Sequence, residues 1–451
     1  MGSCIVVNAQ QSITMYNMIN SNASSSLNPS RIPESKWQLG IPGLSNVNAS
    51  YSNSGFHFNN LIKVVNDSMQ IDYEGALGSM RPHNFIGINA NVQLLSFGLK
   101  FKKNKFFSFN VGLKNTINFR YDREPLELVI VGNGPFINTS KKINFETNSS
   151  SYFEYAFGFA KTYSKNKVGF GGKLKILSGI ANINTKKNDL YFKTNNENYG
   201  LEITSDIDFK TAGSNNPNFS PIGPNLGAAI DFGFFYKWKK NIEFSGSILD
   251  LGAIRWKDDV VNYRSDAPGE TKVFEGVKFS DFFNEEDDYK KAMELLLDSL
   301  QDEFGLDENS EPYTSSIPTQ LYMAVNYDFR KNTTLGFVFY SHFFKSRPIP
   351  GVGISLNQEV FKGVNLMTSY SYYNKEAANI GLGLNLNLGC LQWSVVTDNA
   401  LSYMEYSTAN NLNLRTSLSF QFGRESRLPK YIRKQNKFHK RNRGGRGNYS
   451  F

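Results

Sequence analysis

The sequence is poor in the residues on which many catalytic and metal sites depend, since its 451 residues include only two cysteines and four histidines. Cys4 and Cys390 cannot form a disulfide framework, and no cysteine or histidine pair has the spacing of zinc ligands. Ser341-His342 joins a nucleophile to a base, but neighbours on a strand point to opposite faces and cannot readily hydrogen-bond. We therefore expect no enzymatic activity, no metal and no cofactor.

Long hydrophobic runs are also missing. No stretch of about 18 or more consecutive apolar residues exists, which argues against a protein that crosses a membrane with helices. One long uncharged segment, residues 377–397, has leucines at every second position from 382 to 388. Leu382, Leu384, Leu386 and Leu388 would spread around a helix but share one face of a strand. This segment therefore predicts a strand.

The same period of two recurs in residues 105–121, 225–238 and 411–422. Strands of soluble proteins average roughly 5 to 6 residues, whereas a tilted strand that crosses a bilayer needs about 9 to 11. A soluble sandwich or propeller also alternates. It does not explain why these long runs end in aromatic residues such as Tyr121 and Trp238, which a membrane barrel explains as an interfacial girdle.

The sequence thus predicts an all-β fold, a transmembrane antiparallel β-barrel of about fourteen strands. Its tight turns fall at one end and its long connections at the other, as in bacterial outer-membrane barrels. We place the strands at residues 37–55, 84–101, 105–121, 152–163, 167–183, 222–238, 241–255, 319–329, 333–344, 350–360, 364–374, 378–388, 391–399 and 411–422.

The long outer connections are expected at residues 56–83, 122–151, 184–221 and 256–318, with an edge hairpin near Leu190–Phe209. The extracellular insertion 256–318 is predicted to be helical. Its segment Glu285–Phe304 has an apolar stripe and an acidic opposite face, which is typical of an amphipathic helix. Such a helix would cover the barrel mouth or dock a partner.

The two ends of the chain give separate predictions. Residues 1–9 are interpreted as the remnant of a signal peptide, with no signal at all as the alternative. Residues 10–36 are expected to form an N-terminal segment or plug, and residues 37–423 the barrel. Residues 424–451 form a basic tail with ten basic residues and one acidic residue, so the tail alone accounts for the net charge of +9.

The tail resembles an RNA-binding arm, because aromatic residues lie between its basic residues. A tail on the periplasmic side would meet no nucleic acid. We expect a disordered, solvated tail, with a tether to anionic lipid, peptidoglycan or a protein partner as the alternative. The candidate lipid or partner contacts are Arg433, Lys434, Lys437, Lys440, Arg441 and Arg443.

Several motifs carry a family resemblance, and they are Ser26-Leu27-Asn28-Pro29, Gly40-Ile41-Pro42-Gly43-Leu44-Ser45, the segment 91–98 and Gly171-Gly172-Lys173-Leu174-Lys175. Over roughly residues 20–423 the chain resembles an uncharacterised Bacteroidota family of outer-membrane barrels, a domain of unknown function. That family is similar in style to the PorP/SprF and PorV barrels of type IX secretion and, more distantly, to fatty-acid-transporter barrels. The resemblance implies that Asn28 and Pro29 belong to a segment that can enter the lumen.

Two functions are compatible with these observations. The first is a non-enzymatic scaffold or partner barrel in an envelope or secretion-related assembly. The alternative is a passive or hydrophobic-solute channel of the fatty-acid-transporter type.

Expected partners are outer-membrane lipid and envelope proteins that bind the extracellular loops or the tail, with no nucleic acid. The expected location is the cell outer membrane, with both termini in the periplasm. Gly169, Gly171 and Gly172 are expected to permit curvature or close contact with an inserted segment.

Overall fold

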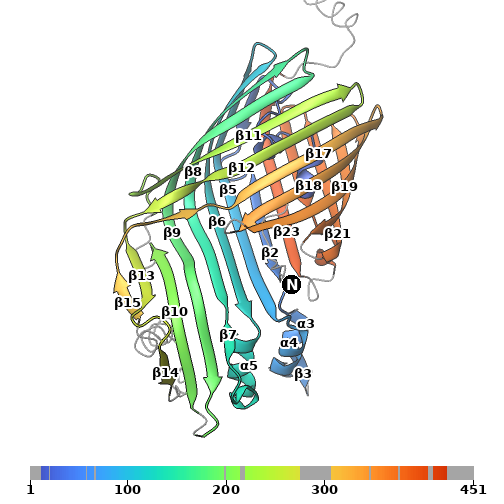
Figure 1. The fold of residues 1–451 in the computed structure, drawn as a ribbon. Coiled ribbons are helices and arrows are strands. Elements are labelled where there is room, and N and C mark those ends of the chain that lie inside the picture. The colour runs from blue at the N-terminus through green and yellow to red at the C-terminus, as the bar shows by residue number, and fades with distance from the viewer. Residues whose placement is uncertain are drawn as a thin grey trace, which may run out of the picture.

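A closed antiparallel barrel dominates the structure, a computed structural model (Figure 1). Its last strand pairs with the first, since Phe422 lies opposite Trp37 and Thr416 opposite Val47. The predicted fold class is therefore confirmed. The structure describes residues 12–19, 21–56, 58–65, 68–197, 200–213, 219–274, 306–344, 347–373, 376–404 and 410–423.

The wall has fourteen strand positions, as predicted. One position is shared by β1 (Trp37–Gly40) and β2 (Val47–Asn53), and another by β16 (Tyr313–Ser316) and β17 (Thr319–Arg330). The other twelve are β5 (His83–Phe101), β6 (Lys105–Asp122), β8 (Phe145–Tyr163), β9 (Val168–Thr194), β11 (Asn225–Lys239), β12 (Ile242–Trp256), β18 (Thr333–Phe344), β19 (Arg347–Phe361), β20 (Val364–Tyr373), β21 (Glu376–Leu388), β22 (Leu391–Thr397) and β23 (Asn411–Phe422).

The remaining elements lie in the N-terminal segment or in the long connections. The predicted edge hairpin exists, because β9 continues past the wall and pairs with β10 from Leu201↔Thr194 to Ala212↔Asn182. The predicted helix Glu285–Phe304 lies outside the described residues. The elements are α1 (Ile13–Asn17), α2 (Ser24–Leu27), α3 (Phe58–Leu61), β3 (Ile62–Val65), β4 (Ser68–Ile71), α4 (Tyr73–Ser79), α5 (Glu124–Val131), η1 (Gly134–Phe136), β7 (Lys141–Ile143), β10 (Leu201–Ala212), β13 (Val260–Ser265), β14 (Thr271–Phe274), β15 (Leu306–Asn309) and η2 (Leu401–Tyr403).

Several predicted strand boundaries differ from the structure, as where the strand predicted at 167–183 continues to Thr194 in β9, and two of the differences need a physical explanation. The first strand, predicted to be continuous over residues 37–55, is interrupted between β1 and β2 because Pro42 lacks a donor and Gly43 adopts φ 74°. The strand predicted at 152–163 begins instead at Phe145, the start of β8. Its polar start, which includes Ser149, lacks apolar alternation, yet it pairs with the extended β9 at Ile183.

The outer face of the wall is apolar and the inner face is polar. Along β11 the outward side chains of Leu226, Ile230 and Trp238 are 48%, 49% and 54% exposed, whereas the inward side chains of Asn225 and Asp231 are buried. Such an outer surface suits the hydrocarbon of a bilayer, with aromatic residues at its edge. No helix within the described ranges is long and apolar enough to span a membrane. The fold is that of a transmembrane β-barrel of the outer-membrane type.

Charge is segregated along the barrel, although residues 1–423 hold as many acidic as basic residues. We define the tight-turn rim as the six segments that surround the end with the short turns. The rim carries fifteen basic and four acidic residues, so the rest of residues 1–423 carries the compensating acidic excess. The rim therefore holds a local excess of positive charge, although the total over residues 1–423 is zero. The rim segments are residues 31–36, 100–105, 161–167, 237–243, 328–331 and 359–362.

Candidate functional site

The lumen is occupied by residues 12–35, which we call the plug. Its helix α1 packs against the inner face of β17 to β22 through apolar side chains such as Ile13 and Met18, both almost fully buried. Tyr16 stacks on Tyr322 with ring centroids 4.6 Å apart and planes 5° from parallel. Tyr340 then contacts both Tyr322 and Tyr373. A row of tyrosines thus fixes the plug to one half of the wall.

Polar contacts hold the plug along its length. The backbone amide of Thr14 donates a hydrogen bond to Asp398 Oδ1 at 2.7 Å. The side-chain Nδ2 of Asn17 donates a hydrogen bond to Ser355 Oγ at 3.0 Å. At the tight-turn end, Arg31 Nη1 lies 2.6 Å from Glu243 Oε1. The described plug therefore runs from the loop side of the lumen to the tight turns and continues directly into β1.

The structure places Asn28 and Pro29 inside the lumen. Asn28 Nδ2 donates to the Tyr16 hydroxyl at 3.0 Å and to the Gly246 carbonyl at 3.4 Å, while its Oδ1 accepts from the Ser30 amide at 3.0 Å. These contacts close a turn that passes close to the wall. Asn28 thereby joins the plug helices to β12.

Two glycines in the wall make room for this turn. A Cβ added at Gly171 would overlap the Pro29 carbonyl, and one added at Gly233 would overlap the Asn28 side chain. The prediction that the glycines near residue 171 permit close contact with an inserted segment is confirmed for Gly171. Gly172 differs, because a Cβ there would meet only the Asp231 carbonyl, at 3.3 Å.

Gly171→Val should loosen the plug, because the added side chain overpacks against Pro29. Overpacking of this kind costs roughly 1–3 kcal/mol. We expect faster cleavage within residues 12–36 during limited proteolysis of the folded protein. Gly172→Val is the matched control, and equal cleavage rates in the two variants would contradict the assigned contact.

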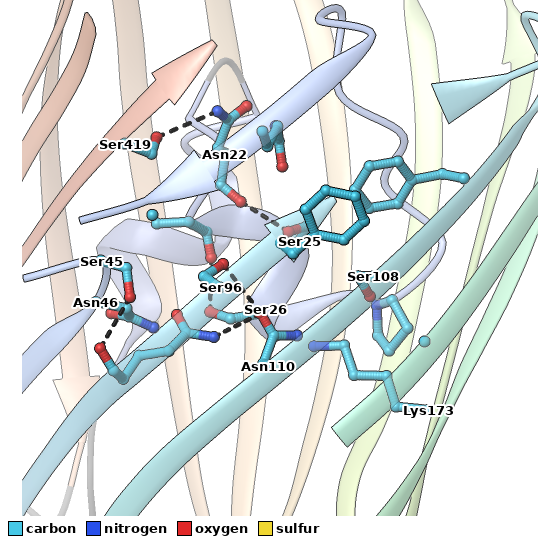
Figure 2. Close-up of a pocket in the computed structure, with 18 of the residues that line it drawn as sticks. Asn22, Ser25, Ser26, Ser45, Asn46, Ser96, Ser108, Asn110, Lys173 and Ser419 are labelled. Atoms are coloured by element: carbon cyan, nitrogen blue, oxygen red, sulfur yellow. Dashed lines mark hydrogen bonds between the residues drawn. The ribbon is translucent and has the colours of Figure 1, made fainter. Parts of the chain in front are cut away.

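Space remains on the other side of the plug, where two cavities adjoin. One of about 50 Å³ lies between the plug and strands β1, β5, β6, β8, β9 and β23. The other, about 340 Å³, lies at the tight-turn end next to Arg31, Lys103 and Lys237. Asn22 and Ser25 line both cavities. Figure 2 shows the hydroxyl and amide groups that surround the first cavity, including Ser45, Asn46, Ser96, Ser108, Asn110 and Ser419.

The interruption between β1 and β2 borders the first cavity. Gly40, Ser45 and Asn46 line it from this part of the wall. The hydrogen bonds across the interruption are irregular, with Leu418 donating to the Leu44 carbonyl and Gln93 donating to the Asn46 carbonyl. The regular ladder is therefore broken where the wall meets the cavity.

A buried charge cluster lies on the inner face of four consecutive wall strands. Lys175 Nζ on β9 is 3.2 Å from Glu154 Oε2 on β8 and 2.8 Å from Asp231 Oδ1 on β11, and it also donates to Asp250 on β12. Asp250 occupies a bulge with φ 60°, and its amide donates to Asp231 Oδ1 at 2.8 Å. The cluster therefore joins the strands at the bulge.

Lys175→Met should destabilise the barrel strongly, because three carboxylates would lose their shared cation. Breaking a buried ion pair in this way costs roughly 3–5 kcal/mol. Lys187→Met removes a half-exposed partner of Asp206 and should cost roughly 0–1 kcal/mol. Urea unfolding in lipid vesicles, followed by tryptophan fluorescence, compares the two. Similar midpoints for both variants would show that the cluster does not hold the wall together.

The remaining predicted residues divide into two groups. Ser341 and His342 are both buried, and neither Ser341 Oγ nor either ring nitrogen of His342 has a hydrogen-bond partner among the described residues. They form no nucleophile-base pair. The tail contacts Arg433, Lys434, Lys437, Lys440, Arg441 and Arg443, like the signal remnant at residues 1–9, lie outside the described residues.

Fold and lumen together define a plugged, fourteen-stranded transmembrane β-barrel. The chain belongs to the family of unknown function DUF5723, whose model matches residues 29–398. A comparison with curated protein sequences finds no match.

Solved structures of similar fold include the following three proteins. The Ralstonia pickettii toluene transporter TbuX is 8% identical, with 89% of this chain and 94% of that chain covered and a TM-score of 0.44. The P. putida toluene transporter TodX is 10% identical, with 90% and 95% covered and a TM-score of 0.41. A Pseudomonas aeruginosa FadL homologue is 8% identical, with 94% and 100% covered and a TM-score of 0.41. Likenesses this remote carry no information on a ligand.

Proposed function

We propose that the protein is a plugged channel of the outer membrane that passes a small polar or amphipathic solute between the plug and one half of the wall. The observation that carries this proposal is the asymmetry of the lumen. Tyrosines and apolar side chains seal the plug to β17–β22, whereas two adjoining cavities remain beside β5, β6, β8 and β9. A plug that served only to close the barrel would gain stability from packing on both sides.

The lining of the cavities favours a polar or amphipathic solute over a purely hydrophobic one. Hydroxyl and amide groups dominate the first cavity, and Lys173 is its only charged side chain among the described residues. Phe106, which is buried on the inner face, adds an apolar part. Each hydroxyl or amide group of this lining can give up one hydrogen bond and form another as a polar solute moves past. The free-energy cost of each exchange is small, because no polar group is left without a partner.

The interruption between β1 and β2 supports a path that can widen. Where a strand ladder is regular, opening the wall breaks a hydrogen bond at every second residue on each side. Between Gly40 and Val47 that ladder is already irregular, so local separation costs less. The first cavity therefore borders the part of the wall that is easiest to deform.

A scaffold or partner barrel in an envelope or secretion-related assembly is the second candidate. It is favoured by the sheet that β9 and β10 extend beyond the wall together with β7, β13, β14 and β15. A protein surface of this kind suits a partner at the loop end. Its link to type IX secretion depends on the family resemblance alone.

Purified protein in planar lipid bilayers separates the two candidates. A channel should give discrete current steps, whereas a scaffold should be silent and should co-purify with a stoichiometric partner from outer membranes. Silence in the bilayer together with such a partner would reject the channel.

Ser108→Trp should reduce the current, because the indole would fill part of the first cavity that Ser108 lines. Phe107→Trp is the control, since Phe107 is adjacent on β6 but faces the lipid. We expect single-channel conductance to fall by half or more only in the first variant. Equal conductance in the two variants would place the path elsewhere.

Arg31→Ala should increase the current, because the Arg31–Glu243 ion pair holds the tight-turn end of the plug next to the second cavity. Loss of the pair leaves Glu243 with only Lys237, whose Nζ is 3.8 Å away. We expect longer or more frequent openings in the bilayer recording. Lys272→Ala, which removes an exposed pair with Asp266 in the loop region, should leave the openings unchanged.

A further inference from the structure

Two neighbouring turns of the tight-turn rim are unusually basic. The turn between β5 and β6 and the turn between β8 and β9 lie side by side because β6 pairs with β8. Residues 102–105 and 161–167 contain six lysines and no acidic residue. Each of the other rim segments holds one to three basic residues together with an acidic one, as at Lys239, Lys240 and Glu243. We call this pair of turns the twin-turn site.

Hydrogen bonds join the two turns into one rigid unit. The Thr162 amide donates to the Asn104 carbonyl at 2.9 Å, and Asn104 Nδ2 donates back to the Thr162 carbonyl at 3.1 Å. Thr162 Oγ1 also donates to Asn166 Oδ1 at 2.5 Å. Between the turns lies an open hollow of about 460 Å³. Its lining residues are Lys102, Lys103, Asn104, Thr162, Tyr163, Ser164, Lys165 and Asn166.

Lysines occupy backbone positions in this site that ordinarily favour glycine or asparagine. Lys102, Lys103 and Lys165 have φ values of 52°, 48° and 56°, which lie in the left-handed region. The loops here have three residues (102–104) and four residues (164–167), and left-handed positions in turns favour glycine, asparagine and aspartate. Lysine there is less favourable for the backbone, so its presence three times in one hollow points to a role for the charge.

Aromatic side chains surround the site at the edge of the lipid-facing surface. Lys161 Nζ lies 4.5 Å from the centroid of Tyr163, and Lys105 Nζ lies 5.9 Å from that of Phe101. Tyr163 and Phe101 are exposed on the outside of the wall. Such aromatic residues mark the depth of the headgroups in barrels of this kind. The ammonium groups of Lys161 and Lys105, which flank the hollow, therefore lie where lipid phosphates are found, and this favours lipid over an acidic soluble protein.

We propose that the twin-turn site binds the phosphate of an anionic phospholipid headgroup in the leaflet next to the tight turns. Lys102, Lys103 and Lys165 supply the positive charge, and the polar groups of Asn104 and Ser164 suit the hydroxyls of a glycerol headgroup. The site belongs to the barrel and not to the tail. Lys103, Thr162 and Asn166 also line the second cavity, but lipid retention is measured separately from conduction, so either proposal can fail alone.

Native mass spectrometry of the full chain tests the proposal. The protein is released from micelles that contain phosphatidylglycerol or phosphatidylcholine with the same acyl chains. The wild type should retain phosphatidylglycerol selectively, and K102Q/K103Q/K165Q should lose about fivefold in affinity for each lysine removed. The triple variant K239Q/K331Q/K362Q, which removes three rim lysines outside the site, is the matched control. Unchanged heat-dependent gel mobility shows that each variant is folded.

Three results would overturn the assignment. Equal retention of the two lipids by the wild type would show that no anion site exists. Equal losses in the two triple variants would assign the binding to diffuse rim charge. Displacement of phosphatidylglycerol by an equal concentration of inorganic phosphate would identify a site for soluble anions instead of a lipid site.

Discussion

Closure of the sheet is the constraint on which the rest of this structure depends. Backbone groups in hydrocarbon have no water to bind, so every strand must pair on both sides, and β23 must return to β1 and β2. In a closed barrel the outward side chains contact lipid and must be apolar. Consecutive strands cross the membrane in opposite directions, so short turns join them at one end and long connections at the other. Because lipid determines the outer face, features specific to this protein are concentrated in the lumen and at the two rims.

The sequence predicted the wall well because its main signal, a period of two, is a direct consequence of lipid on one side. Prediction was wrong where that period is absent, at Pro42-Gly43 and in the polar start of β8. The lumen was harder. The position of Asn28 and Pro29 came from resemblance, and Glu154, Lys175, Asp231 and Asp250 become one cluster only through the register of four strands. Charged residues at inward positions between apolar ones were the available signal.

Net charge illustrates the same limit. The sum over residues 1–423 is zero, which indicates a neutral body with a basic tail. Only the topology shows that six short segments gather at one end and bring fifteen basic residues with them. A charge interacts with what lies near it, within about 10 Å at moderate salt, so the distribution matters more than the sum. The rim therefore attracts anions whether or not the tail is present.

The plug combines two modes of attachment that have different physical consequences. Against β17–β22 it is held by buried aromatic and apolar contacts, which are lost only if the plug leaves as a unit. Against the opposite half it is held by Asn28 in a turn that only glycine at positions 171 and 233 can accommodate, with open polar space on the same side. Hydrogen bonds to small polar groups can be exchanged for bonds to water or solute. The lumen can thus change on one side while the plug stays fixed on the other, so passage of a solute does not require the plug to unfold.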